Sequence, residues 1–175
     1  MKVQVKMAIS AEDLFDSITE SVLYDAEQAK GKKIPAKKLK AGFSYQKMLD
    51  AKVGGAQHVT TKITDFEPPY LYAASITSSR GVNTVRYEIE PIEGQDAINV
   101  TYEEGYVGDK ALNDLNGKLV GALYSPFAKR KIKNRLRDME MYIKQHGGTS
   151  KAADSDADRL EGPQDAADDA AESEE

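Results

Sequence analysis

The 175-residue chain contains no cysteine and no tryptophan, and it has only two histidines, His58 and His146. Without cysteine it cannot form a disulfide scaffold, a zinc–thiolate site or a thiol nucleophile. Two histidines leave almost nothing from which to build a transition-metal site, and no phosphate loop or dinucleotide fingerprint is present, so we expect neither a metal nor a cofactor. No stretch approaches the roughly 18 consecutive apolar residues of a membrane span. The alternating N-terminal sequence MKVQVKMAI also lacks the apolar core of a signal peptide. We therefore expect a soluble cytoplasmic protein.

Acidic residues are concentrated late in the chain. Residues 147–175 contain ten acidic and two basic residues, a net charge of −8, whereas residues 1–146 contain 22 basic and 19 acidic ones. The acidic segment has a single large apolar side chain, Leu160, so it buries too little surface to offset the entropy of ordering. We predict a folded domain over residues 1–146 and a disordered acidic tail over residues 147–175. The tail either shields a basic surface or only adds solubility.

The spacing of apolar residues predicts a strand and then a helix at the start of the chain. Val3, Val5 and Met7 alternate with polar residues, which is the period of a half-buried strand. Ser10 follows, at the position of a helix N-cap. Apolar residues then recur at helical spacing as far as Gly31, which is a plausible helix end: they are Leu14, Phe15, Ile18, Val22 and Ala26. The lysine-rich stretch 30–40 is expected to contain a second, short helix.

From residue 43 the period is two for about 65 residues, which predicts a series of strands. The turns between them are short, so the strands should pair as antiparallel hairpins. The alternating positions of the successive strands are Phe43 and Tyr45; Val59, Thr61 and Ile63; residues 70–77; Val85, Tyr87 and Ile89; and Ile98, Val100 and Tyr102.

After Asp109 the period becomes helical again, with apolar stripes at Leu112, Leu115, Leu119 and Leu123 and at Ile132, Leu136, Met139 and Ile143. Ser125-Pro126 lies between the stripes and is typical of a helix start, so either one helix kinks or two helices meet. The predicted order is strand, helix, five strands, helix. A sheet with one apolar face must be covered by a second layer, and the C-terminal helix is the only candidate long enough.

Four short sequence motifs resemble those of a known protein family. They are the strand end Ile63-Thr64-Asp65-Phe66-Glu67-Pro68-Pro69, the Arg80-Gly81 turn, Tyr87-Glu88-Ile89-Glu90-Pro91 and Ile98-Asn99-Val100-Thr101-Tyr102. With the element order, residues 1–146 resemble the helix-grip (START, SRPBCC or birch-pollen-allergen-like) superfamily. Its polyketide-cyclase and heat-shock-activator branches are similar, and uncharacterised bacterial members known only as domains of unknown function are more similar still. The resemblance implies an α+β fold in which a curved antiparallel sheet of about six strands wraps a long C-terminal helix. It implies no catalytic set.

Tyrosine supplies nine of the thirteen aromatic residues. A phenol combines an apolar body with one hydrogen-bonding group, which suits a cavity that holds a partly polar ligand, although tyrosine also simply favours strands. We expect a cavity between the sheet and the C-terminal helix, with loops at residues 30–42 and 105–110 forming its mouth. Its predicted lining residues are Phe43, Tyr45, Tyr87, Tyr102, Leu119, Leu123 and Phe127.

Catalytic residues are harder to find. His58 should lie on the outward face of its strand without an orienting partner, so we interpret it as a solvated histidine. Glu88 and Glu90 share the polar face of their strand with Arg86, which favours cross-strand charge pairing over a paired-carboxylate glycosidase site.

Basic residues are concentrated on the last helix, where they could form an interaction surface at Lys129, Arg130, Lys133 and Arg137. No aromatic residue interrupts the basic run, which argues against nucleic acid as the partner.

Three functions follow. The favoured one is non-enzymatic binding of a hydrophobic or lipid-like small molecule. The alternative is a protein-interaction or chaperone-accessory module that uses the basic face, and the third is a cyclase- or hydratase-like enzyme.

Overall fold

The computed structural model describes residues 1–51, 55–108 and 126–146. In order, the elements are β1 (Lys2–Met7), α1 (Ala11–Lys30), the short 3-10 helix η1 (Ala36–Lys38), β2 (Ser44–Ala51), β3 (Gly55–Glu67), β4 (Leu71–Ser78), β5 (Gly81–Pro91), β6 (Ile98–Gly108) and α4 (Pro126–His146). The predicted order of strand, helix, five strands and helix is confirmed.

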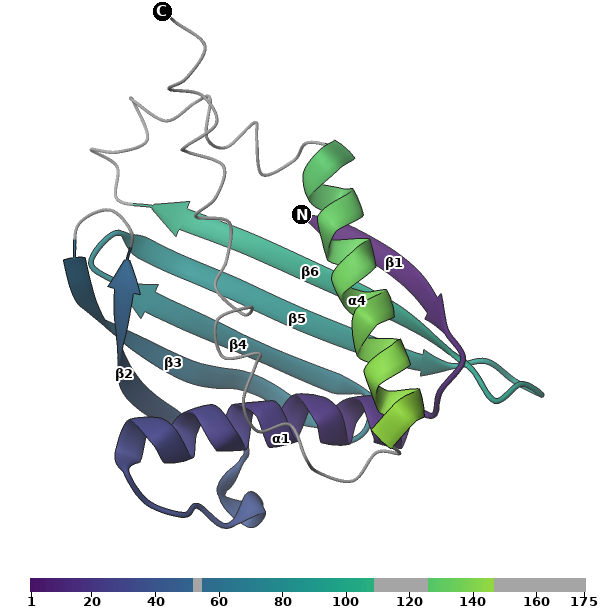
Figure 1. The fold of residues 1–175 in the computed structure, drawn as a ribbon, viewed down its shortest axis with the longest axis horizontal. Coiled ribbons are helices and arrows are strands. Elements are labelled where there is room, and N and C mark those ends of the chain that lie inside the picture. The colour runs from purple at the N-terminus through teal and green to yellow at the C-terminus, as the bar shows by residue number, and fades with distance from the viewer. Residues whose placement is uncertain (52–54, 109–125, 147–175) are drawn as a thin grey trace, which may run out of the picture.

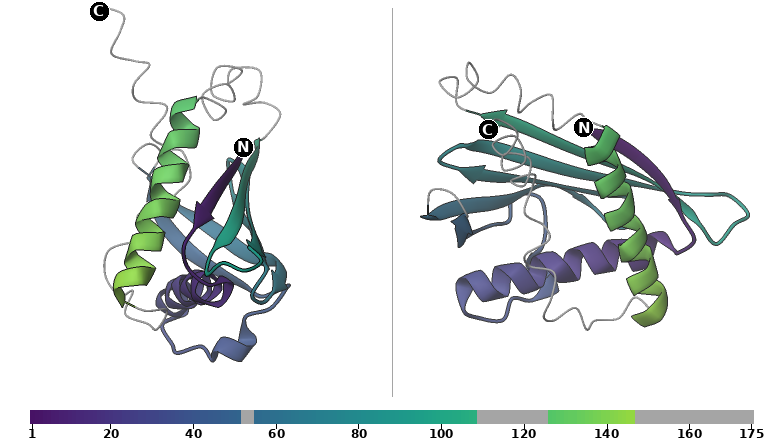
Figure 2. Two further views of the ribbon diagram at one scale, coloured as in Figure 1. Left: turned by 90° about the vertical axis from the view of Figure 1, so that its right-hand side faces the viewer. Right: turned by 45° about the horizontal axis from the view of Figure 1, so that its top comes forward.

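All six strands form one antiparallel sheet in the order β1-β6-β5-β4-β3-β2. Figure 1 shows α1 and α4 on the same side of this sheet, so neither of the two described α-helices lies on the opposite side. We call these two sides the inner face and the outer face. The two views in Figure 2 show the curvature of the sheet around the helices.

Helix α1 begins and ends where local chemistry dictates. The Ser10 hydroxyl accepts a hydrogen bond from the Asp13 backbone N–H at 3.0 Å, which satisfies a donor that has no partner within the helix. Gly31 ends the helix in the left-handed conformation, at φ 62°. Between these caps, one face of α1 is buried against the sheet: Leu14, Phe15, Ile18, Val22 and Ala26.

The core lies between the inner face and the two helices. Strand residues alternate across a sheet, so one set of alternate positions is buried there: among them Val3, Met7, Ile63, Tyr72, Tyr87, Ile89, Val100 and Tyr102. From α4 come Ile132, Leu136 and Ile143, which are 7%, 2% and 4% exposed. Burial of this kind stabilises the fold by about 25 cal/mol per Å² of apolar surface.

The lysine-rich stretch contains a short helix, as expected: the three-residue 3-10 helix η1. One local expectation changes. Residues 105–108, expected in a loop, continue β6 to Gly108 because they remain paired with β5. Among the described elements, α4 packs mainly on β1 and also against α1. The apolar stripe at Leu112–Leu123 and the Ser125 cap lie outside the described residues.

Candidate binding site on the inner face

A row of three tyrosines crosses the centre of the inner face. Tyr72 on β4 is directly opposite Tyr87 on β5, and Tyr87 is directly opposite Tyr102 on β6. The ring centroids are 6.4 Å apart for Tyr72 and Tyr87, and 4.9 Å apart for Tyr87 and Tyr102, with the second pair edge-to-face. Because the register places them opposite one another, all three side chains lie on one face. We call these residues the tyrosine row.

The row continues in both directions with apolar side chains. Phe66 on β3 is opposite Tyr72, and Val3 on β1 is opposite Tyr102. Phe66 contacts Phe15 of α1 edge-to-face, at 5.3 Å between ring centroids. The tyrosine row therefore has an apolar wall at each end, built from α1 and from β1.

The hydroxyls of the tyrosine row differ in their partners. Tyr102 donates a hydrogen bond of 3.5 Å to Oε2 of Glu104, two residues along the same strand. Tyr72 and Tyr87 are only 4% and 8% exposed, yet neither hydroxyl has a hydrogen-bond partner among the described residues. Among the described residues, the fully buried side-chain polar atom that lacks a partner is the Tyr142 hydroxyl oxygen. The hydroxyl oxygens of Tyr72 and Tyr87 are therefore not fully buried, and both are donors free to bind an acceptor.

Burial keeps the row protonated. It raises the pKa of Tyr87 to about 12, against a smaller lowering by Arg135. Burial likewise raises the pKa of Tyr72 and of Tyr102 above the usual tyrosine value. At neutral pH all three hydroxyls are therefore hydrogen-bond donors, which suits a ligand that presents an acceptor.

A carboxylate and a guanidinium flank the row. Burial raises the pKa of Glu104, and Arg135 of α4 opposes that rise. Arg135 also favours the ionised forms of Tyr87 and Tyr102. Glu104 and Arg135 are both half-buried. The tyrosine row thus has one charged group of each sign beside it.

A second polar group lies where α1 meets β2. The Tyr45 hydroxyl donates to Oδ2 of Asp25, and the Lys47 ammonium donates to Oδ1 of the same carboxylate at 3.0 Å. Burial raises the pKa of Tyr45, and the neighbouring Asp25 raises it further. Because Asp25 has both oxygens occupied, this cluster holds α1 on the sheet and offers a ligand no unpaired group.

The structure brings together only some of the predicted lining residues. Tyr45, Tyr87 and Tyr102 are buried on the inner face, and half-buried Phe43 lies 6.2 Å from Tyr45 between ring centroids. Leu119 and Leu123 lie outside the described residues. We expected Phe127 to line the cavity. Its side chain is instead 79% exposed in the first turn of α4 and does not lie with the tyrosine row.

Sequence reasoning missed Tyr72 as a lining residue and did not find Glu104 or Arg135. Tyr72 follows from register, since it lies opposite Tyr87. A signal for Glu104 was available, because residues two apart on a strand share a face and Tyr102 was already placed inward. Arg135 precedes the buried Leu136, at the edge of the apolar stripe, where the helical pattern alone does not separate inward from outward cations.

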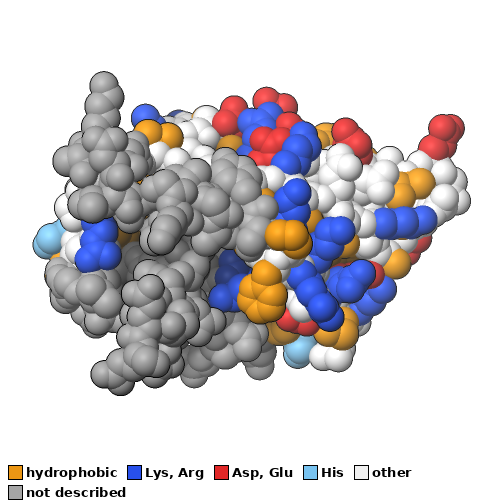
Figure 3. Space-filling view, turned by 90° about the horizontal axis from the view of Figure 1, so that it is seen from above, with side chains coloured by type: hydrophobic (Ala, Val, Ile, Leu, Met, Phe, Trp, Pro, Cys, Tyr) orange, Lys and Arg blue, Asp and Glu red, His pale blue; other side chains and the backbone are white. Residues whose placement is uncertain are grey.

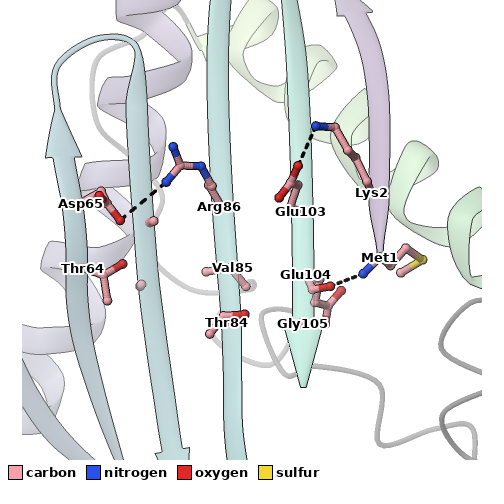
Figure 4. A pocket seen from close by; sticks show the side chains of 12 residues that line it. Met1, Lys2, Thr64, Asp65, Thr84, Val85, Arg86, Glu103, Glu104 and Gly105 are labelled. Atoms are coloured by element: carbon pink, nitrogen blue, oxygen red, sulfur yellow. Dashed lines mark hydrogen bonds and ion pairs between the residues drawn. The ribbon is translucent and has the colours of Figure 1, made fainter. Parts of the chain in front are cut away.

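The outer face carries an open hollow of about 470 Å³. Figure 4 shows it from the side away from the helices, with Asp65, Arg86, Glu103 and Lys2 side by side across the strands. The charges already pair: Lys2 lies 2.7 Å from Glu103, and Arg86 lies 3.6 Å from Asp65. The hydrogen bond from Lys2 lowers the pKa of Glu103. With its charges neutralised internally, this hollow is a weaker candidate than the inner face.

The other early candidates behave as surface groups. His58 is exposed on the outer face. Arg86 donates a hydrogen bond of 2.9 Å to Glu88 on the same strand, and its pairing between strands is with Asp65 of β3. Among the described residues, no three His, Asp or Glu side chains gather in a way that could hold a metal ion. No helix in this part of the chain is long and apolar enough to cross a membrane.

The curved antiparallel sheet that packs α1 and α4 on one face defines the class by its fold, an α+β helix-grip arrangement (Figure 1). A conserved protein from Geobacillus kaustophilus is similar, with a TM-score of 0.51 and 14% identity over 82% of this chain and 94% of that one. A protein from Rhodobacter sphaeroides has a TM-score of 0.48 and 16% identity over 83% and 93% of the two chains. Ara h 8.0201 has a TM-score of 0.48 and 14% identity over 83% and 97%.

The family model described as Domain of unknown function (DUF3284) matches residues 1–125. The chain belongs to this family. No curated protein matches it.

Proposed function

We propose that this protein binds a small molecule with an apolar body and a hydrogen-bond acceptor, without transforming it. The observation that carries the proposal is the tyrosine row itself, in which the rings of Tyr72 and Tyr87 lie on an apolar face and their hydroxyls, which are not fully buried, have no acceptor among the described residues. The ligand would lie on the inner face, against the tyrosine row.

The proposed mechanism is burial with orientation. Apolar contact with the tyrosine rings and the neighbouring Val85, which is half-buried, supplies affinity in proportion to the area removed from water, at about 25 cal/mol per Å². The two hydroxyls then fix the orientation, because each gains a hydrogen bond worth about 1 kcal/mol. A lipid-like molecule with a carbonyl, ester or ether oxygen has this chemistry. Leu119 and Leu123 are proposed as further lining residues.

Binding is favoured over a reaction by the surroundings of Glu104. This half-buried carboxyl would be the natural acid or base, but ordinary structural causes explain its raised pKa: burial raises it, while Arg135, the N-terminal amine and the hydrogen bond from Tyr102 lower it. Structural charge pairs shift pKa values as catalytic ones do. Among the residues that the structure describes, no other group on the inner face combines a nucleophile with a base beside it.

The test is a fluorescence titration with Nile red, a neutral fused-ring probe that carries a carbonyl acceptor. We expect saturable, one-to-one binding to the full chain. Because two hydrogen bonds are lost, the double variant Tyr72→Phe/Tyr87→Phe should bind the probe about 10-fold more weakly, or more. Tyr70→Phe makes the same chemical change at a side chain that is 51% exposed, so it should leave the affinity unchanged.

Two results would overturn the proposal. One is the absence of saturable Nile red binding to the folded wild-type chain. The other is an equal loss of affinity in the double variant and in Tyr70→Phe, since that would place the probe away from the tyrosine row. Far-UV circular dichroism of each variant verifies that the fold is intact.

A further inference from the structure

The outward side of α4 carries a group of cations that the fold does not use. Lys129, Arg130, Lys133 and Arg137 are all exposed, and Figure 3 shows Lys and Arg side chains gathered over this helix. We call these four residues the α4 basic face. Lys129, Arg130 and Lys133 form no ion pair with any described residue. They therefore contribute little to holding the helix on the sheet.

Helix stability does not explain these charges either. The positive end of a helix dipole lies at its N-terminus, where each nearby cation costs about 0.3–1 kcal/mol. Lys129 and Arg130 lie close to the start of α4 at Pro126, and the first turn contains no acidic residue. An anionic partner would offset this unfavourable arrangement.

We infer that the α4 basic face binds the acidic segment of the same chain, residues 147–175. Charge favours this occupant: the segment has ten acidic residues against two basic ones, and it follows α4 directly at His146. Because the two are covalently joined, the effective concentration is in the millimolar range. A separate anionic molecule would have to compete with that concentration and with the repulsion from the segment itself.

The distances match. At 1.5 Å per residue, Arg137 and Lys129 lie about 14 and 26 Å back along the helix from His146. A flexible chain of n residues would span about 5–6 Å × √n, which is about 14–21 Å for the 8 to 12 residues between His146 and Asp154 or Asp158. For the 23 residues to Asp169 the same rule gives about 26 Å. A chain of this length could therefore bring its first acidic residues to Arg137, and its later ones to Lys129, without being stretched.

The absence of cysteine makes a direct test straightforward. Ser155→Cys introduces a single thiol between two acidic residues, and a nitroxide attached there broadens the amide NMR signals of nearby residues. In the full chain we expect strong broadening from Lys129 to Arg137 at low salt. The broadening should disappear near 1 M NaCl, where the Debye length is about 3 Å.

Two matched variants separate docking from simple tethering. With the ten acids of residues 147–175 replaced by Asn or Gln, the folded domain is unchanged, and the broadening over the α4 basic face should be lost. With Lys62→Glu, an exposed charge reversal on the outer face of the sheet, the broadening should persist. Equal broadening in the charged and neutralised chains would overturn the inference, as would preferential broadening of the lysines at residues 32–40.

Discussion

Leu136 offers the strongest test of how α4 is held, because its side chain is 2% exposed between the helix and the sheet. Leu136→Ala removes three buried carbon atoms, which at about 0.8 kcal/mol each accounts for roughly 2.4 kcal/mol. The cavity left behind adds to this loss, and buried Leu→Ala changes cost about 2–5 kcal/mol in total. We expect the free energy of unfolding to fall by about 3 kcal/mol.

Urea unfolding followed by far-UV circular dichroism measures this change as a lower midpoint at an unchanged slope. Met141→Ala is the matched control, since it shortens an apolar side chain on the same helix that is 54% exposed, and it should change the free energy by less than about 0.5 kcal/mol. A loss below about 1 kcal/mol in Leu136→Ala would refute the packing of α4 described above.

Two further predictions concern charge and backbone. Glu104 has a raised pKa, so its folded form binds more protons and its contribution to stability falls as pH rises through the folded value. Glu104→Gln should therefore be more stable relative to wild type at pH 7 than at pH 4 by thermal unfolding. Glu103→Gln should instead be more stable relative to wild type at pH 4 than at pH 7, because the pKa of Glu103 is lowered. The same pH dependence in both variants would contradict the placement of Glu103 and Glu104 on opposite faces of β6. Gly81→Ala would place a Cβ atom 2.4 Å from the Val107 carbonyl oxygen at φ 148°, so it should lower the free energy of unfolding in urea by more than about 2 kcal/mol. Gly94→Ala, at φ 71° in open space, should lower it by about 1 kcal/mol. Equal losses in the two variants would contradict the close contact at Gly81.

The strands were predictable because one rule governs them. Period-two alternation placed Val85, Tyr87 and Ile89 on one face and Arg86 and Glu88 on the other, and the register of the sheet confirms both. Short polar turns between the strands left hairpins as the simplest connection. The caps of α1 followed from side-chain and glycine chemistry that acts within a few residues.

The candidate site was only partly predictable because it depends on contacts between distant segments. An apolar stripe shows which face of α4 is buried, but not that the helix packs on β1 and α1. Glu104 was not singled out from the sequence because a carboxylate on a strand usually lies on the surface. Its inward position becomes reasonable only with Arg135, which α4 brings close to it. Asp25 shows the same limit, since Tyr45 and Lys47 lie on a strand about 20 residues later.

The central claim is that a small molecule lies against the tyrosine row, and native mass spectrometry of the full chain purified from its own host tests it most directly. We expect a one-to-one adduct that organic extraction releases as a molecule with an apolar body and an oxygen acceptor. In Tyr72→Phe/Tyr87→Phe the adduct should be much reduced, and in Tyr70→Phe it should be retained. A spectrum of the bare polypeptide alone, from a folded wild-type chain that also fails to bind Nile red, would contradict the account.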